Sequence, residues 1–293
     1  MLRDDEFFPN GAGTKWRKLK HLTAAKGIAT LGGAFSNHLH AVASLGVAYE
    51  IPTVGLVRGE YVDEENPTLS FCRNAGMSIR PIKKQEFDQG LRSQVVCGVF
   101  DALADYSVLP MGGDSMAARR GAGEIVDDII AQLPVGQAFQ VVLGAGSGST
   151  ARGVASRLNP GQYCIGVPAA MMHGLDEGPC ASLSELEESS RQPSWLPPPS
   201  EPFAEMSSAR LLAIEKFFAD EGILLDPIYT SRAILSVQHL RPKDDRLSTV
   251  IVHTGGLQGW AGMKCKNVSS PLAVAIQKAI AQTLAAVPNE TGH

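Results

Sequence analysis

Short apolar runs alternate along the chain with longer segments in which apolar residues recur at helical spacing. The short runs predict strands at residues 28–31, 53–57, 78–82, 108–110, 140–143, 164–167 and 249–253. The longer segments predict helices at residues 37–45, 67–75, 94–104, 118–133, 150–158 and 209–221. Strands that alternate with helices in this way are typical of α/β proteins with parallel sheets. The pattern therefore predicts an α/β fold.

Glycine turns follow three of the predicted strands, at residues 32–33, 144–148 and 255–256. Ligands of parallel sheets bind at the carboxyl ends of the strands, and glycine lets the backbone come close to a ligand. Three such turns predict a ligand site at this edge. Residues 178–202 break the alternation, because an acidic stretch is followed there by a proline-rich one. This composition predicts an exposed loop.

Three polar residues, Ser36, Asn37 and His38, stand where the helix after the first glycine turn begins. Free backbone N–H groups and the helix dipole favour anionic groups at such a point. The alternative is that Ser36 or Asn37 only caps the helix.

The second turn contains the loop Gly146-Ser147-Gly148-Ser149-Thr150, between a predicted strand and a predicted helix. Its backbone N–H groups and hydroxyls are the donors that hold a phosphate, and a plain strand-to-helix turn is the alternative. The loop lacks the acidic residue of a dinucleotide-binding site and the lysine of a nucleotide-binding loop. A phosphate loop without a nucleotide, together with a lysine elsewhere, favours pyridoxal phosphate.

Composition excludes several classes of function. The 293 residues, 44% of them hydrophobic, can bury the core of one large domain or two smaller ones. A net charge of −4 gives no basic footprint, so we expect no nucleic-acid partner. No apolar run reaches the ~20 residues that span a bilayer, and the acidic N-terminus does not resemble a secretion signal. We therefore expect no membrane partner.

The five cysteines are scattered and show no CxxC spacing. An odd, scattered set argues against a disulfide framework and against a zinc site. We therefore expect no bound metal and a cytoplasmic location.

The motifs, taken in order, resemble those of the fold-type-II pyridoxal-phosphate enzymes, in particular the group of D-cysteine desulfhydrase and 1-aminocyclopropane-1-carboxylate deaminase. The resemblance extends almost to Trp260 and rests on Arg3-Asp4-Asp5, Gly13-Thr14-Lys15, Gly32-Gly33, Ser36-Asn37-His38 and residues 146–150, 225–230 and 253–256. It implies two open, twisted parallel-sheet domains with the cofactor between them. The small domain would comprise residues 18–112 and the large one residues 1–17 and 113–293. The resemblance also implies a homodimer.

Catalytic roles for Lys15, Ser36 and Tyr229 follow from the resemblance. Lys15 would bind the cofactor aldehyde covalently and then act as a base, a role that burial can favour by lowering the pKa of a lysine. Ser36 would meet the substrate carboxylate or transfer a proton, and Tyr229 would lie beside the substrate. The competing interpretations are a solvated basic face around Lys15 and a core position for Tyr229.

The resemblance also assigns residues that bind the cofactor and the substrate. The implied cofactor-binding residues are Lys15, Asn37, Gly146, Ser147, Gly148, Ser149, Thr150, Thr230 and Thr254. Asn37 would face the phenolic oxygen, and Thr230 or Thr254 the pyridine nitrogen. The implied substrate-binding residues are Ser36, His38, Phe203 and Tyr229. For His38, a packing role is the alternative.

Two departures from the deaminase pattern indicate the reaction. Thr230 stands where the deaminases have a glutamate, and Phe203 where they have a tyrosine. Both changes weigh against opening of a cyclopropane ring and favour β-elimination, as in D-cysteine desulfhydrase, which would yield an α-keto acid, ammonia and sulfide. A 1-aminocyclopropane-1-carboxylate deaminase is one alternative.

A catalytically weakened homologue that still binds pyridoxal phosphate is the second alternative. It is suggested by Thr14 and Ser149, which replace an asparagine and a glycine of the family, and by an N-terminal segment shorter than usual. An enzyme related to the tryptophan synthase β subunit or to threonine dehydratase shares the implied fold and lysine, but fits the late motifs poorly.

Overall fold

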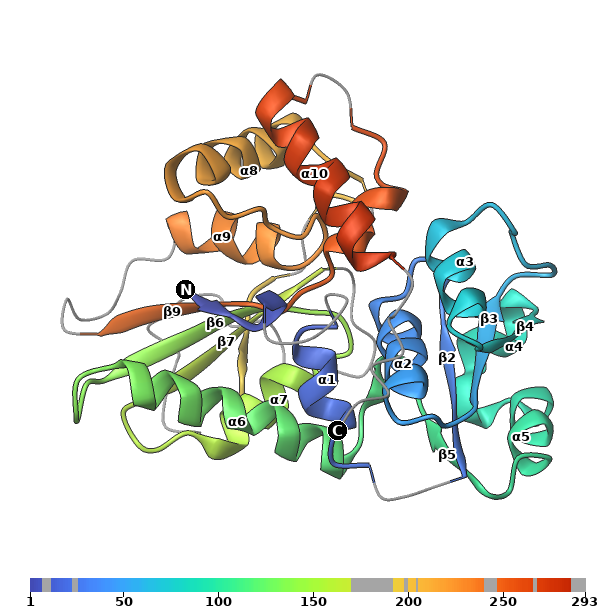
Figure 1. Ribbon diagram of the computed structural model, residues 1–293. Helices are drawn as coiled ribbons and strands as arrows, with labels where there is room; N and C mark the ends of the chain where they lie inside the picture. Colours follow the sequence, from blue (N-terminus) through green and yellow to red (C-terminus); the bar gives the residue numbers. More distant parts are fainter. Residues whose placement is uncertain are drawn as a thin grey trace.

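The computed structural model describes residues 1–6, 12–22, 26–169, 192–197, 200–203, 205–239, 247–265 and 268–285. Their strands form two parallel sheets that lie beside each other (Figure 1). The larger sheet has the order β1 (Leu2–Arg3), β9 (Ser248–His253), β6 (Phe139–Ala145), β7 (Tyr163–Pro168) and β8 (Ser194–Trp195). The smaller has the order β4 (Ser78–Ile82), β3 (Thr53–Arg58), β2 (Gly27–Gly32) and β5 (Tyr106–Leu109).

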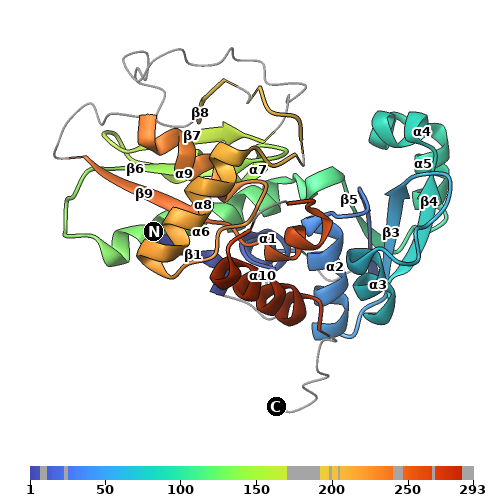
Figure 2. The same cartoon turned by 90° about the horizontal axis from the view of Figure 1, so that it is seen from above.

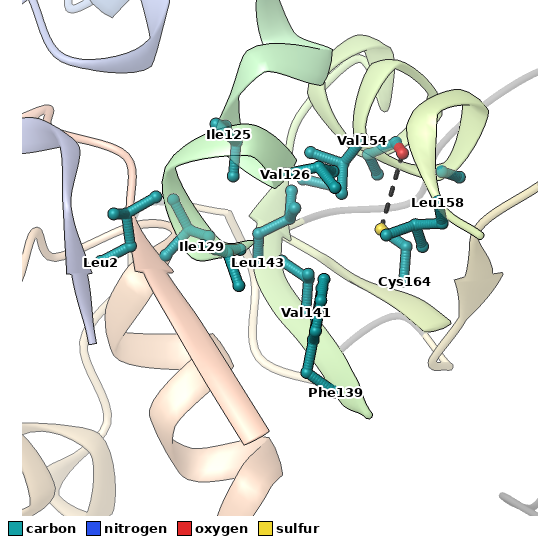
Figure 3. Packing of buried hydrophobic residues seen from close by; sticks show 14 of the residues in the cluster. Leu2, Ile125, Val126, Ile129, Phe139, Val141, Leu143, Val154, Leu158 and Cys164 are labelled. Atoms are coloured by element: carbon teal, nitrogen blue, oxygen red, sulfur yellow. Dashed lines mark hydrogen bonds between the residues drawn. The ribbon is translucent and has the colours of Figure 1, made fainter. Parts of the chain in front are cut away.

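Helices cover both faces of the larger sheet (Figure 1). On one face lie α6 (Met116–Gln132) and α7 (Ser149–Arg157), and on the other α8 (Ser208–Glu221), α9 (Thr230–His239) and α10 (Ser270–Thr283). Ile125 and Val126 of α6 and Val154 of α7 belong to the same buried cluster as Val141 and Leu143 of β6 (Figure 3). Because β6 is buried on both faces, it reads as a continuous apolar run.

The smaller sheet is also covered on both faces. One face packs against α2 (Asn37–Ala48) and α3 (Pro67–Asn74), and the other against α4 (Lys84–Gln89) and α5 (Gln94–Asp101). Successive side chains of a strand point to opposite faces. Accordingly, Ile28 packs with Leu39 of α2, whereas Leu31 packs with Phe100 of α5.

The short helix α1 (Thr14–Leu19) packs against α2 and against α6, so it lies between the two sheets (Figures 1 and 2). Short 3-10 turns occupy Asp4–Glu6, Gly90–Arg92, Met111–Gly113 and Leu257–Gly262. Since β1, β9 and β6 are neighbours and run parallel, the segments that follow them meet at one edge of the larger sheet. This edge faces α1.

The predicted fold class is confirmed, and each predicted strand and helix is present with ends shifted by at most a few residues. The family resemblance implies a strand that ends at Arg3-Asp4-Asp5, and β1 is present there, whereas β8, α1, α4, α9 and α10 were not predicted. All strands of the smaller sheet lie within residues 27–109, inside the predicted small domain. The domain boundaries themselves stay a prediction.

The prediction of an exposed loop at 178–202 is wrong for Trp195, which is buried in β8. Gly166 of β7 is its register partner, and a Cβ at Gly166 would lie 2.3 Å from the indole ring. A glycine in the facing strand therefore makes room for the indole. Residues 178–191 lie outside the described residues. Among the described helices, none is both long and apolar enough to span a bilayer.

Candidate active site

The turn before α1 brings Lys15 to the edge of the larger sheet. Gly13 has a φ of +55°, and a Cβ at this position would lie 2.3 Å from the carbonyl oxygen of Thr254. The same carbonyl accepts a hydrogen bond from the Thr14 backbone N–H at 3.2 Å. Only glycine allows this contact. Burial lowers the pKa of the Lys15 amine to about 8.

The solvated basic face that competed with a catalytic Lys15 is not found. Arg17 and Lys18 are only 3% and 1% exposed. Arg17 donates to both carboxylate oxygens of the buried Asp4, at 2.8 and 3.0 Å. Lys18 Nζ donates to the Gly112 carbonyl at 2.6 Å, and burial, followed by the charge of Lys15, holds the pKa of Lys18 well below its usual range. Because Arg17 and Lys18 have hydrogen-bond partners in other elements, these two basic side chains are buried in the interior.

The start of α2 is capped as the alternative interpretation proposed. The Ser36 hydroxyl oxygen accepts hydrogen bonds from the backbone N–H groups of His38 and Leu39, at 3.2 and 3.3 Å. The Asn37 amide oxygen accepts from Gln258 Nε2 at 2.9 Å. A Cβ at Gly256 would lie 2.2 Å from Asn37 Nδ2, so the glycine turn after β9 packs directly on this amide. The helix start at 36–37 is therefore brought to the same edge as Lys15.

His38 is buried and tied to the smaller sheet. Its Nε2 lies 2.9 Å from the Thr30 hydroxyl, which itself donates to the Leu109 carbonyl at 3.0 Å. The Thr30 oxygen must therefore accept, and Nε2 carries the proton. Burial, followed by the charges of Lys15 and Lys18, holds the pKa of His38 well below its usual range. His38 is thus a neutral residue that fixes the start of α2 to the strand ends, as the packing alternative proposed.

The predicted phosphate loop connects β6 to α7. Gly148 has a φ of +76°, and Ser149 begins the helix, so the backbone N–H groups of the first turn point out of the helix end. Ser147 is exposed, and its carbonyl accepts from Arg152 Nη1 at 3.1 Å. The Ser149 hydroxyl is buried and has no hydrogen-bond partner among the described residues. This arrangement suits an anion at the start of α7.

Tyr229 and Thr230 are positioned by Asp226. The buried Asp226 carboxylate accepts hydrogen bonds from the backbone N–H groups of Ile228, Tyr229 and Thr230, at 3.0, 2.7 and 2.7 Å. The Tyr229 hydroxyl lies 3.2 Å from the place of a Cβ at Gly146. Tyr229 therefore lies against the phosphate loop, and burial raises the pKa of its hydroxyl to about 12.

Thr230 is fully buried, and its hydroxyl has no hydrogen-bond partner among the described residues. A buried hydroxyl without a partner is costly and calls for a ligand group. The structure gives less support for Thr254 and Phe203 as residues of the site. Thr254 contributes its carbonyl to the lysine turn, and Phe203 is 54% exposed. No interaction within the described part of the chain connects Phe203 to Lys15.

Sequence reasoning missed four residues of this site. Lys18, Thr30, Asp226 and Gln258 hold the others in place or lie buried beside them. Asp226 carried a signal, because an aspartate followed by proline is typical of a turn that leads into a helix. In the described ranges, no group of three or more His, Cys, Asp or Glu side chains could hold a metal ion.

Comparison with known proteins agrees with the geometry, although no family model matches the chain. The chain is 24% identical over 290 residues to a candidate 1-aminocyclopropane-1-carboxylate deaminase of Thermotoga maritima, with 88% of each chain covered. It is 24% identical to the bifunctional D-cysteine desulfhydrase/1-aminocyclopropane-1-carboxylate deaminase, mitochondrial, of Arabidopsis thaliana, with 88% of this chain and 72% of that protein covered. The resemblance inferred from the motifs is confirmed.

A solved structure of a 1-aminocyclopropane-1-carboxylate deaminase homologue superposes with a TM-score of 0.67 at 20% identity, covering 94% of this chain and 87% of that one. The chain therefore has the fold of the fold-type-II enzymes. At this identity the superposition supports the fold alone, and the activity has to be argued from the site.

Proposed function

We propose that the protein binds pyridoxal phosphate through Lys15 and catalyses β-elimination from a small amino acid, with D-cysteine as the preferred substrate type. The observation that carries the proposal is the convergence of three different features at one sheet edge. These are a partly buried lysine on a glycine turn, a glycine loop at a helix start, and the buried hydroxyl of Thr230, which has no partner among the described residues. The similarity to a named D-cysteine desulfhydrase supports the same function.

The described residues fit this cofactor. Lys15 would hold its aldehyde, the first turn of α7 its phosphate, and the Thr230 hydroxyl its ring nitrogen. When bound, pyridoxal phosphate supplies an electron sink for the negative charge that develops at the substrate α-carbon. Because a threonine hydroxyl is a neutral partner, it would not hold the ring nitrogen protonated as a carboxylate would. A less electron-withdrawing ring suits loss of a good leaving group better than opening of a carbon ring.

Lys15 and Tyr229 differ in how they can handle protons. With a pKa of about 8, a substantial fraction of the Lys15 amine is neutral near pH 8, and Nζ can accept a proton from the substrate. The Tyr229 hydroxyl, whose pKa burial raises to about 12, stays protonated and can donate a hydrogen bond. The two groups therefore support a base at Lys15 and a hydrogen-bond donor at Tyr229.

The test begins with the purified protein and added pyridoxal phosphate. We expect an absorption band near the edge of the visible range that Lys15→Ala abolishes, whereas Lys20→Ala, at the exposed end of the same helix, keeps it. Release of pyruvate is then measured with D-cysteine and β-chloro-D-alanine, release of 2-oxobutanoate with 1-aminocyclopropane-1-carboxylate, and release of sulfide with D-cysteine.

We expect elimination to exceed ring opening. Ring opening without elimination from D-cysteine would move the assignment to the deaminase. A Lys15-dependent band without turnover of any of the three compounds would favour the weakened, cofactor-binding homologue.

We also propose a homodimer in the cytoplasm. The resemblance to the family supports the dimer, and the free thiols of Cys72, Cys97, Cys164 and Cys265 support a reducing compartment. A native mass of about one chain, 31.1 kDa, would contradict the dimer.

A further inference from the structure

The helix that carries Lys15 has only six residues, Thr14–Leu19. A helix this short is not stable alone, so contacts with other elements must set its rotation about its own axis. Successive side chains of a helix are about 100° apart, and therefore any contact that fixes Thr14 also fixes the direction of Lys15. The bonds made by Thr14 and by Arg17, one turn later, show what holds this rotation.

Both side chains bind the same buried carboxylate, Asp4, which directly follows β1. The Thr14 hydroxyl donates to Asp4 Oδ2 at 2.7 Å. Arg17 donates to Oδ2 at 3.0 Å and to Oδ1 at 2.8 Å, and it also pairs with Asp128 of α6 at 2.6 Å. Thr14 and Arg17, three residues apart, share one face of α1. Lys15 and Lys18, one residue further on, share the face that is turned about 100° away.

Asp4 thus ties together β1, α1 and, through Arg17, α6. A buried charge is tolerated only where it is paired and hydrogen-bonded, and the removal of one partner leaves the rest of the group unsatisfied. Few other arrangements of these side chains would satisfy all the hydrogen bonds of the network. The network therefore restricts α1 to one rotation and so fixes the direction of the Lys15 side chain.

We infer that Asp4 and Thr14 are positioning residues that aim Lys15. The inference deepens the proposed function and rests on it for the role of Lys15. It assigns a purpose to a residue that the sequence analysis took as a sign of a weakened site.

The test compares Thr14→Val, which keeps the shape but loses the hydroxyl, with Thr14→Ser, which keeps the hydroxyl. Thr68→Val is the matched control, because the Thr68 hydroxyl is buried without a partner among the described residues. Two quantities are measured in each variant. One is the rate at which the apoprotein is acetylated at Lys15, followed by mass spectrometry across pH, and the other is the rate at which added pyridoxal phosphate forms its lysine-dependent band.

We expect Thr14→Val to form the band about tenfold more slowly, a factor that corresponds to about 1.4 kcal/mol, and to show an altered acetylation profile at Lys15. Thr14→Ser should restore both rates to within about threefold, and Thr68→Val should leave both unchanged. Wild-type rates in folded Thr14→Val would overturn the inference. If Thr14→Val does not fold, Asp4→Asn takes its place, and wild-type acetylation at Lys15 in that variant would overturn it equally.

The acetylation measurement separates this inference from the proposed function. A wild-type protein that forms no band with pyridoxal phosphate would refute the proposed function. The effect of Thr14→Val on the acetylation of Lys15 in the apoprotein would still decide whether Thr14 aims the lysine.

Discussion

Replacement of Lys15 by methionine should make the apoprotein more stable at neutral pH while it removes the proposed anchor of the cofactor. The reason is the low pKa of Lys15, about 8 instead of 10.5, which burial causes. A buried amine that must carry a proton at pH 7 costs stability, and methionine fills a similar volume without a charge. Function and stability would then oppose each other at this residue.

The magnitude follows from the two pKa values. Each pKa unit corresponds to about 1.4 kcal/mol, so the change from 10.5 to about 8 sets an upper limit of about 3.5 kcal/mol. Lys15 is only partly buried, and contact with solvent reduces the cost, so we expect Lys15→Met to add about 1–3 kcal/mol to the free energy of unfolding at pH 7.

The two pKa values of Lys15 also determine whether the stability of the protein rises or falls with pH. Between pH 8 and pH 10.5 the unfolded chain binds a proton at Lys15 that the folded chain does not, so the stability of the wild type rises with pH in this window. Below about pH 8 the whole penalty is present. The advantage of Lys15→Met should therefore be constant below pH 8 and shrink towards zero as the pH approaches 10.5.

Urea unfolding of both apoproteins from pH 6 to pH 10 measures this difference. Lys278→Met, on an exposed position of α10, is the control and should show no comparable gain. The reasoning would be refuted by a Lys15→Met variant that is no more stable than the wild type at pH 7. A gain that stays the same up to pH 10 would refute it as well, because the gain would then come from packing and not from the charge.

Two further substitutions test contacts that hold the site together. His40 Nε2 donates to the Thr283 carbonyl at 2.7 Å and so joins α2 to the end of α10; His40→Phe should cost about 1–3 kcal/mol in urea unfolding, and His40→Gln should recover part of it. Gly256→Ala would place a Cβ 2.2 Å from Asn37 Nδ2 at a φ of +94°, and we expect it to weaken the binding of pyridoxal phosphate in an absorbance titration. Gly76→Ala has a similar φ, +80°, but meets no atom within 4 Å, so equal effects of the two alanines on cofactor binding would contradict the clash.

The sequence predicted most of the fold because the strands β2, β3, β6 and β7 are buried along almost their whole length and are therefore rich in apolar residues. It missed β8, since a strand of two residues is too short to show a period. The prediction of an exposed loop failed at Trp195 because the residue that explains its burial lies in another strand. Gly166, in a strand far along the chain, provides the space that buries the indole.

The positions of Lys15, Asn37 and Thr230 could be predicted, because short motifs mark the turns on which they lie. The burial of Lys18 could not. A run of basic residues reads as a solvated face until the carbonyl of Gly112, 94 residues away, is placed against it. Contacts of this kind depend on how helices from distant parts of the chain pack, and a local pattern carries no trace of them.

The two departures from the family motifs, Thr14 and Ser149, differ in how the structure accommodates them. Thr14 makes a buried hydrogen bond to Asp4, and Arg17, whose guanidinium binds the same carboxylate, completes the support of the lysine turn. Ser149, in the place of a glycine, is buried at the start of α7, and its hydroxyl has no hydrogen-bond partner among the described residues. A site that is losing its function accumulates substitutions without such partners, because nothing selects for their compensation. Thr14 has such a partner in the Asp4 carboxylate, and this supports the active enzyme that we propose over a homologue that only binds the cofactor.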